Sequence, residues 1–170
     1  MRKKKLKKPY FSIVTVVKND ETNIQKTIKS IISQDYKNFE YILIDGKSTD
    51  KTLEKINKYK NKIHLILSEK DKGIYFAMNK GIKLAKGKIL VFVNSGDFLK
   101  PNALRLVRES FENNKNFDYL FGTVLRHYTN TSILKYGVNP KRLIYNFDFA
   151  TTHSAGFFLK KNVYKKYGLL

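Results

Sequence analysis

The stretch that decides the fold is Ile89–Pro101, which has the sequence ILVFVNSGDFLKP. Five apolar residues, Ile89–Val93, are followed at once by four small or polar ones, Asn94–Asp97. A continuous apolar run of this length is typical of a strand that is buried on both faces, as in a parallel sheet. Residues just past the carboxyl end of such a strand lie where open α/β sheets bind ligands. The stretch therefore predicts a buried strand that ends at a candidate ligand site.

Apolar runs and amphipathic segments alternate along residues 12–111. The predicted strands cover residues 12–17, 39–45, 63–67 and 89–93, and the predicted helices cover residues 22–34, 48–59, 74–85 and 101–111. Strands that alternate with helices pack into a mostly parallel sheet with right-handed crossovers and with helices on its faces. The fold class predicted is therefore α/β, with a Rossmann-like sheet.

Polar residues and glycines beside the predicted helices indicate where these helices begin and end. Thr22 and Gln25 match a capping box at the start of the first helix. Ser48 or Thr49 can cap the second helix. Gly87 stands where a C-cap glycine is expected after the third helix.

The pattern changes after residue 111. The sequence predicts a strand and hairpin at 117–128 and 133–137, a further strand at 155–161 and the start of a helix at 162–168. No repeat and no low-complexity linker divides the chain. We therefore predict a single domain over residues 9–170, with an added antiparallel part toward its C-terminus, preceded by a basic arm at residues 1–8 that we expect to be disordered.

The composition is that of a folded protein with a sizeable core: 170 residues, of which 42% are hydrophobic and 28% charged. No apolar run approaches the length of a transmembrane helix. The basic start, MRKKKLKKPYF, is not followed by the apolar segment of a secretory signal, so we expect a cytoplasmic location. Because the chain has no cysteine, disulfides and thiolate metal sites are excluded.

The formal net charge is +20, from 34 lysines and arginines against 14 acids. Such a charge attracts anions, which include nucleic acid, the phosphates of a nucleotide and an anionic membrane surface. The charge is spread along the chain rather than gathered in one stripe, so a lysine-rich solvated surface without a specific partner fits it equally well. Charge alone does not choose among these partners.

Polar side chains follow each of the four predicted strands. They are Asn19 and Asp20 after the first, Asp45 after the second, Glu69 and Asp71 after the third, and Asp97 after the fourth. In a parallel sheet these strand ends share one edge, and carboxylates there can hold the divalent cation that accompanies a nucleotide diphosphate. Strand-end acids are also common turn formers and helix caps, the role we expect for Asp50. We expect Asp45 and Asp97 to face a shared cleft. The sugar-nucleotide assignment from the strand ends collapses if the two side chains lie on opposite edges of the sheet or if either is sealed inside the packed core.

Two longer stretches resemble a known family. They are residues 11–52, FSIVTVVKNDETNIQKTIKSIISQDYKNFEYILIDGKSTDKT, and residues 69–104, EKDKGIYFAMNKGIKLAKGKILVFVNSGDFLKPNAL. Both resemble the N-terminal, nucleotide-binding part of family 2 glycosyltransferases with the GT-A fold, in the subgroup that builds bacterial capsule, exopolysaccharide or lipopolysaccharide. Several motifs occur in order at the family's spacing, which makes the resemblance more specific than one glycine pattern. It is strong over residues 9–101 and weaker over residues 152–164.

The resemblance implies a donor site. The residues implied to bind the nucleotide sugar are Val16, Asn19, Asp45, Asn79, Asn94, Ser95 and His153, and the residue implied to hold the metal is Asp97. The family moves a sugar, with inversion, from a nucleotide-diphosphate donor to a glycan or lipid-linked acceptor, assisted by Mg²⁺ or Mn²⁺. A hexosyltransferase-type enzyme of the cell envelope, peripheral at the inner face of the plasma membrane, is therefore expected.

The sequence departs from the family at the metal motif and at the catalytic base. The family's Asp-x-Asp is replaced by Asn94 and Gly96, which leaves Asp97 as the only carboxylate of the motif. A neutral Asn94 binds a hard cation more weakly than an aspartate does. Gly46 replaces a second acid often found after the second strand, and Phe76 stands where subgroup members tend to have an acid.

The general base of the family comes from a later segment. The last acid of this chain is Asp148, whose position does not suit that role. The catalytic base is therefore expected to be missing, and the chain is expected to be truncated at its C-terminus. This leaves a second hypothesis, a donor-binding fragment that is catalytically incomplete.

Two further hypotheses come from other classes. A basic nucleic-acid-binding α/β domain fits the charge, but the sequence shows no recognised DNA- or RNA-binding motif. A doubly wound phospho-receiver or flavodoxin-like domain fits the alternating strands and helices, but does not account for the joint occurrence of IDGKSTD and NSGD.

Overall fold

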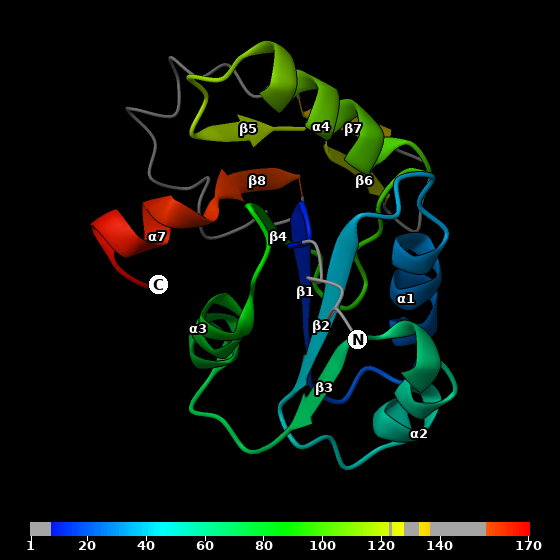
Figure 1. Cartoon of the computed structure of the whole chain (residues 1–170). Coiled ribbons are helices and arrows are strands. Elements are labelled where there is room, and N and C mark those ends of the chain that lie inside the picture. Colours follow the sequence, from blue (N-terminus) through cyan, green and yellow to red (C-terminus); the bar gives the residue numbers. More distant parts are fainter. Residues whose placement is uncertain (1–7, 123, 128–132, 137–155) are drawn as a thin grey trace, which may run out of the picture.

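The computed structural model describes residues 8–122, 124–127, 133–136 and 156–170. A central sheet lies between helices on its two faces (Figure 1). The helices are α1 (Ile24–Ile32), α2 (Thr52–Asn57), the short 3-10 helix η1 (Lys60–Lys62), α3 (Ile74–Leu84), α4 (Ala103–Asn113) and α7 (Lys161–Tyr167). α1, α2 and α4 contribute to one apolar cluster and α3 and α7 to a second cluster across the sheet.

The main sheet has six strands in the described part of the chain, in the order β3-β2-β1-β4-β8-β5. They are β1 (Phe11–Val17), β2 (Phe39–Asp45), β3 (Leu65–Ser68), β4 (Ile89–Phe92), β5 (Tyr119–Phe121) and β8 (Phe157–Lys160). β1 to β4 are parallel, and β8 runs antiparallel to both β4 and β5. β6 (Val124–His127) and β7 (Ile133–Tyr136) form a separate antiparallel pair. The predicted α/β fold with an antiparallel addition is confirmed.

The strand order places a topological switch point at β1. The chain proceeds from β1 to β2 and β3 on one side, and then returns to place β4 on the other side. Crevices at such a point, outside the carboxyl ends of the strands, are the usual ligand sites of open α/β sheets. The end of β1 and the end of β4 are therefore where a site is expected.

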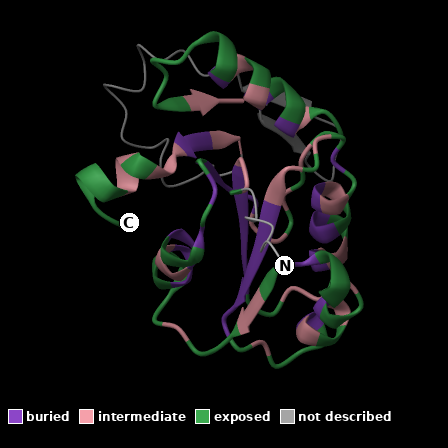
Figure 2. Cartoon of the chain, in the orientation of Figure 1, coloured by how far each residue is buried: buried purple, intermediate pink, exposed green. Residues whose placement is uncertain are grey.

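The central strands are buried as the apolar runs predict. Every residue of β1 is buried, as is every residue of β4, and the buried residues follow these strands and the inner sides of the helices (Figure 2). β3 differs from the prediction, because it begins at Leu65 rather than Ile63 and lies at the edge of the sheet with Leu65 exposed. A short apolar run does not by itself distinguish a central strand from an edge strand.

The starts of α1 and α2 correct two local predictions. Thr22 and Gln25 form no capping box. α1 has Asn23 at its N-cap position, and the main-chain N–H of Asn23 donates to Asp20 Oδ1 at 3.2 Å. The start of α2 is capped neither by Ser48 nor by Thr49, since Asp50 Oδ1 accepts the Thr52 N–H at 2.9 Å. Lys51 occupies the N-cap position of α2 and does not cap it, so Asp50 acts from one residue earlier, by accepting the N–H of the first helical residue.

Gly87 serves a different purpose from the predicted C-cap. α3 ends at Leu84, with Ala85 at the C-cap position. A Cβ at Gly87 would lie 2.5 Å from the Ser12 nitrogen, and the Gly87 N–H donates to Ser12 Oγ at 2.7 Å. Glycine is therefore needed here because the loop before β4 passes directly against the backbone of β1.

Candidate functional site

An open pocket of about 590 Å³ lies at the carboxyl end of β1, beside the start of α3. Its lining consists of Val16, Val17, Lys18, Asp71, Lys72, Gly73, Ile74 and Ala77. Val16, expected to contact the nucleotide, is among them. The pocket thus occupies the edge of the sheet at which the strand-end residues were expected to gather.

The pocket wall is suited to an anion for two reasons. Lys18 and Lys72 are both exposed and lie in its lining, so they supply positive charge. α3 begins at Ile74 in the same lining, and its N-cap residue, Gly73, has no side chain to cap it; Asp71, which also lines the pocket, accepts the Gly73 N–H at 3.0 Å. The first N–H groups of a helix have no acceptor within the helix and lie at the positive end of its dipole. A phosphate group fits such a wall.

The loop after β4 is held by α1. Gly96 adopts a φ of 93°, a conformation that favours glycine. Its N–H donates to Thr27 Oγ1 at 3.0 Å, and the Thr27 hydroxyl donates to the main-chain oxygen of Asp97 at 2.8 Å. The Asp97 side chain is half-buried at the end of this turn. The conformation of the candidate metal residue therefore depends on a helix more than 60 residues earlier in the chain.

Ser95 and Asn94 lie on the same turn, between β4 and Asp97. The Ser95 hydroxyl donates to Asp20 Oδ2 at 2.6 Å, and the Ser95 N–H donates to the Val16 main-chain oxygen at 3.3 Å. The Asn94 main-chain oxygen accepts the Asp97 N–H at 2.9 Å. These bonds join the ends of β1 and β4, so both predicted residues lie where the two strand ends meet.

Asp45 does not face a cleft, which corrects the expectation that it shares one with Asp97. Its side chain is 0% exposed. Its carboxylate accepts the Ser48 hydroxyl at 2.5 Å, the Ser48 N–H at 3.1 Å and the Ser68 hydroxyl at 2.6 Å. A buried carboxylate has to be satisfied by donors, and the loop after β2 and the neighbouring β3 supply them. In this structure Asp45 organises the loop and does not line the pocket, so the sugar-nucleotide assignment from a cleft shared by the two acids fails.

The residue after Asp45 is the one that approaches the pocket lining. A Cβ built on Gly46 would lie 3.1 Å from Asp71 Oδ2 and 3.3 Å from Lys18 Cδ, and both of these residues line the pocket. The second acid that the family often has at this position would therefore stand close to Asp71. Glycine at position 46 avoids placing two carboxylates side by side.

Of the predicted site residues that the structure describes, only Val16 belongs to the pocket lining, so Asn94, Ser95 and Asp97 lie outside it, as Asn19 and Asn79 do. Asn19 is exposed, and its Oδ1 accepts the Thr49 N–H at 2.8 Å, which ties the loops after β1 and β2 together. Asn79, on α3, donates from Nδ2 to the Leu170 main-chain oxygen at 2.7 Å and accepts the Leu170 N–H at 2.9 Å. His153 lies outside the described residues.

Sequence reasoning missed two parts of the site. The first is the pair of lysines, Lys18 and Lys72, which look like any others in a lysine-rich chain. The second is the set of α1 side chains that hold the loop after β4. A signal for the second was present, because polar residues recur at helical spacing between the buried isoleucines of α1.

The described residues form no metal site on their own. Among them no group of three or more histidine, aspartate or glutamate side chains is placed to hold a metal ion. Mg²⁺ is often bound by one or two carboxylates together with the phosphates of a substrate. Asp97 fits that second kind of site, as a single carboxylate that needs ligand oxygens from the bound molecule.

Comparison with known proteins identifies the family. The model of glycosyl transferase family 2 matches residues 12–167. The chain belongs to this family. A glycosyltransferase of PGL/p-HBAD biosynthesis from Mycobacterium bovis is 32% identical over 126 residues, which are 72% of this chain and 49% of the relative. The Escherichia coli enzyme WfgD, a UDP-Glc:α-D-GlcNAc-diphosphoundecaprenol β-1,3-glucosyltransferase, is 31% identical over 137 residues, 79% of this chain and 53% of that protein.

Solved structures share the fold. Staphylococcus aureus TarS 1–349 in complex with UDP-GlcNAc matches with a TM-score of 0.74 and 23% identity, over 92% of this chain and 46% of TarS. The mannosyltransferase PcManGT from Pyrobaculum calidifontis, in complex with GDP-Man and Mn²⁺, matches with a TM-score of 0.66 and 18% identity, over 96% of this chain and 48% of that chain. This family 2 chain spans about half the length of the relatives that it matches. Within the described residues, no helix has the length and apolar character needed to cross a membrane.

Proposed function

We propose that the pocket at the end of β1 binds the nucleotide-diphosphate part of a sugar donor. The observation that carries this proposal is the joint presence, in the lining of one pocket, of Lys18, Lys72 and the start of α3. Cationic side chains and free helix N–H groups both bind phosphate oxygens. Two structural neighbours are complexes with UDP-GlcNAc and with GDP-Man, which supports a donor of this class without choosing its base or its sugar.

A divalent cation, Mg²⁺ or Mn²⁺, would be held by Asp97 together with oxygens of the donor diphosphate. Bound there, the cation would neutralise negative charge on the nucleoside diphosphate, which is the leaving group of the transfer. The neighbour PcManGT was solved with Mn²⁺, which supports the choice of metal class. The role of this chain would be to hold the main chain at Asp97 in place, through the bonds of Thr27 to Gly96 and Asp97.

The reaction proposed is the transfer of the sugar, with inversion, to a glycan or a lipid-linked acceptor. The E. coli relative is named for an acceptor linked to diphosphoundecaprenol, which supports an acceptor of that class and a role in building an envelope polysaccharide. We assign no general base to a residue of this chain. Donor binding and transfer are therefore separate parts of the proposal, and a catalytically incomplete donor-binding chain is the alternative.

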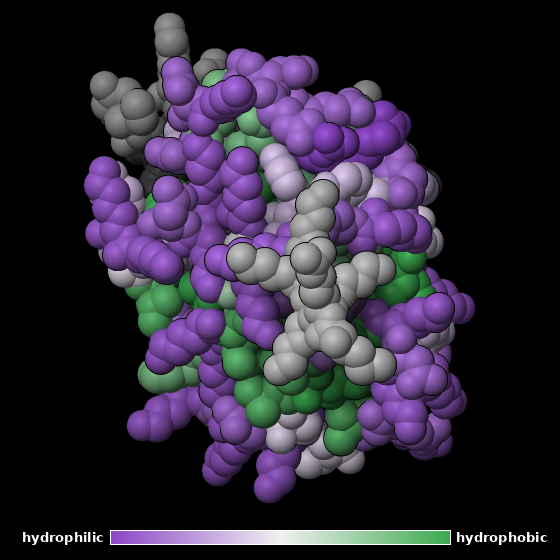
Figure 3. Space-filling view, viewed as in Figure 1, coloured by the Kyte–Doolittle hydropathy of each residue, from purple (hydrophilic) through white to green (hydrophobic). Residues whose placement is uncertain are grey.

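A peripheral position on an anionic membrane surface fits the outer side of the pocket. Three consecutive apolar residues at the start of α3, Ile74, Tyr75 and Phe76, are exposed, and Lys70 and Lys72 precede them. On the face seen in Figure 3, apolar atoms between α3 and β3 are bordered by hydrophilic side chains. Apolar side chains next to lysines suit the boundary between acyl chains and anionic head groups.

Donor binding is tested by the melting temperature in the presence of UDP- and GDP-sugars, each with and without MnCl₂. A ligand that binds only the native state at 100 times its Kd adds about 2.7 kcal/mol of stability, so a rise of several degrees is expected with the correct donor. Lys72→Glu should remove most of this rise. Lys62→Glu makes the same change of charge on η1. This short helix precedes β3 and so lies at the amino end of the strands, away from the pocket, and the variant should keep the rise.

Two results would contradict the proposal. One is the absence of any rise with common nucleotide sugars, together with tight and salt-sensitive DNA binding, which would favour the nucleic-acid hypothesis. The other is an equal loss of the rise in both lysine variants, which would place the donor elsewhere. Binding of the donor without transfer or hydrolysis of the sugar would favour the donor-binding fragment.

A further inference from the structure

α1 carries a polar stripe as well as its apolar face. Thr27 and Ser30 lie three residues apart on one side of α1, and Gln34, two residues past the end of the helix at Ile32, continues the same stripe. Thr27 and Gln34 are fully buried. Buried polar side chains are retained at a cost unless they have partners, which makes their contacts informative.

Apart from two local bonds, Ser30 Oγ to the Thr27 oxygen at 2.8 Å and Gln34 Nε2 to the Ser30 oxygen at 3.0 Å, the partners of this stripe belong to the main chain of one segment, residues 96–104. Thr27 accepts the N–H of Gly96 and donates to the oxygen of Asp97. The remaining contacts are these: Ser30 Oγ accepts the Leu99 N–H at 3.2 Å, Gln34 Nε2 donates to the Lys100 oxygen at 2.8 Å, and Gln34 Oε1 accepts the Leu104 N–H at 3.2 Å. The stripe therefore holds residues 96–104, from the turn after β4 to the first turn of α4, at five main-chain groups.

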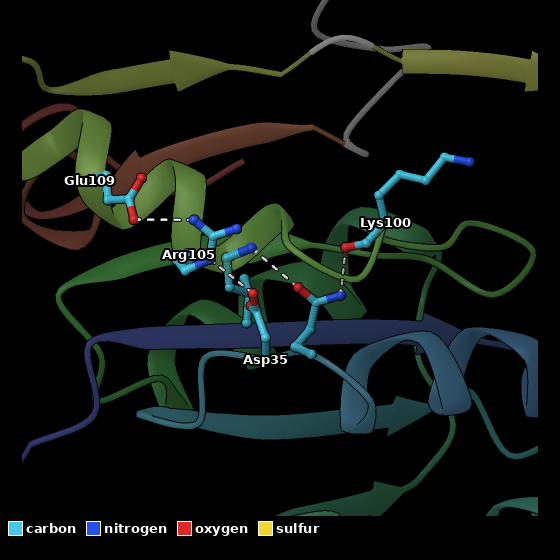
Figure 4. A network of polar contacts seen from close by, with 6 residues as sticks. Asp35, Lys100, Arg105 and Glu109 are labelled. Atoms are coloured by element: carbon cyan, nitrogen blue, oxygen red, sulfur yellow. Dashed lines mark hydrogen bonds and ion pairs between the residues drawn. The ribbon is translucent and has the colours of Figure 1, made fainter.

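Ion pairs reinforce the far end of the same connection. Figure 4 shows Asp35, just after α1, facing Arg105 on α4, and Arg105 facing Glu109. Arg105 Nε lies 2.9 Å from Asp35 Oδ2, and Arg105 also contacts Glu109 at 3.3 Å. The Asp35 N–H donates to the Pro101 oxygen at 3.2 Å. These groups are exposed, so the buried stripe, rather than the ion pairs, carries most of the hold.

We propose that Thr27, Ser30 and Gln34 form a clamp that sets the backbone of the loop after β4, and that Thr27 is a positioning residue for donor and metal binding at Asp97. The positioning role rests on the function proposed above. Thr27 contacts the main chain of Asp97 itself, so a shift of this hydroxyl moves the carboxylate relative to the pocket. A residue that orients a metal ligand without touching the metal acts through such contacts, and its loss lowers metal affinity by about tenfold or more.

The clamp itself is tested by amide hydrogen exchange, which needs no ligand. Thr27→Val keeps the shape of the side chain and removes the hydroxyl, so the Gly96 amide should exchange up to about tenfold faster. Thr27→Ser keeps the hydroxyl and should restore protection. Ser12→Ala is the matched control. Ser12 is also fully buried and its hydroxyl is also bonded, to the Gly87 N–H and the Glu40 carboxylate, but it lies near the amino end of β1, away from the loop after β4. Unchanged exchange at Gly96 in Thr27→Val would overturn the clamp.

The positioning role is tested by the Mn²⁺-dependent affinity for UDP and GDP, measured calorimetrically on the same variants. Thr27→Val should weaken binding by about tenfold, Thr27→Ser should bind nearly as the unaltered chain does, and Ser12→Ala should lose stability but keep its affinity. Equal affinity in Thr27→Val and the unaltered chain, or an equal loss in Ser12→Ala, would overturn it. If the unaltered chain binds neither nucleotide, the proposed function fails and the positioning role with it, whereas exchange at Gly96 still decides whether the clamp exists.

Discussion

Asp97 is the one acid of the sequence motif NSGD, and its surroundings suit a single-carboxylate cation site. It is half-buried at the end of a turn whose backbone is held by Thr27. Because the described residues offer no cluster of further acids, the cation would take its other ligands from the donor. Metal binding and donor binding are therefore expected to be mutually dependent.

Replacing Asp97 by alanine should abolish the metal-dependent part of the donor's stabilising effect. The part of the stabilisation that does not need Mn²⁺ should persist, since Lys18, Lys72 and the start of α3 are unchanged. Melting curves with and without MnCl₂ separate the two parts. An undiminished metal-dependent rise in Asp97→Ala would remove this residue from the metal site.

Glu40 illustrates a buried acid with a purely structural role. It lies at the amino edge of the sheet, where its carboxylate accepts the Ser12 hydroxyl at 2.5 Å, the Gly87 N–H at 3.1 Å and the Lys86 N–H. Glu40→Ala leaves these donors buried without an acceptor, so it should lower the free energy of unfolding by about 2 kcal/mol. Denaturant titration measures the loss, and Glu109→Ala, which removes an exposed ion pair of α4, should cost less than about 1 kcal/mol. Equal losses of unfolding free energy in the two variants would show that the buried bonds of Glu40 do not stabilise the fold more than an exposed ion pair does.

At the scale of the elements, α7 reaches the α3 side of the sheet through one aromatic side chain. Tyr164 packs against the apolar cluster that α3 makes with β1, β2 and β4. Burial raises the pKa of the Tyr164 phenol to about 12, from an ordinary value of 10.0. The neutral phenol is therefore favoured in the folded chain.

This shift predicts how stability depends on alkaline pH. Below pH 10 the phenol is neutral in both states and costs nothing. Between about pH 10 and pH 12 the unfolded chain releases a proton that the folded chain retains, so stability falls as the pH rises. Tyr164→Phe should reduce this fall, and Tyr167→Phe, at the exposed end of α7, should not. Urea midpoints measured at pH 9, 10 and 11 test the difference, and a parallel fall in all three proteins would mean that Tyr164 does not contribute.

At the scale of the whole molecule, the net charge of +20 and the exposed apolar start of α3 act together. Charge alone would bind any polyanion, whereas a membrane surface also accepts apolar side chains. The two contributions can be separated, because charge is screened by salt and apolar insertion is not.

Binding to vesicles is expected to require anionic lipid and to weaken at high salt. Phe76→Ser should lower the fraction bound by several-fold, because Phe76 is 54% exposed beside the pocket. Leu106→Ser on α4 removes a similarly exposed apolar side chain, 47% exposed, from the helix that packs against the opposite side of the sheet and should have little effect. Co-sedimentation with phosphatidylglycerol and phosphatidylcholine vesicles makes the comparison. Equal binding by the two variants would reject the start of α3 as the contact.

The order and type of the elements followed from the sequence alone. Each element has to bury one face, so the spacing of its apolar residues is a local signal: the isoleucines of α1 and the continuous runs of β1, β2 and β4 placed the helices and the central strands. The family could also be predicted, because its motifs are short and occur in a fixed order. The same reasoning placed a candidate site at the strand ends, where the structure has its pocket.

Tertiary structure alone decided how the polar residues at the strand ends are held and which way they point. Asp45 and Asp97 both end a strand, but Ser48 and Ser68 turn Asp45 inward and Thr27 holds the backbone at Asp97. Gly87 was predicted to end a helix, but it lies directly against the backbone of β1. The physical reason is that a polar side chain takes its orientation from its hydrogen-bond partners, and these come from segments with no fixed spacing along the chain.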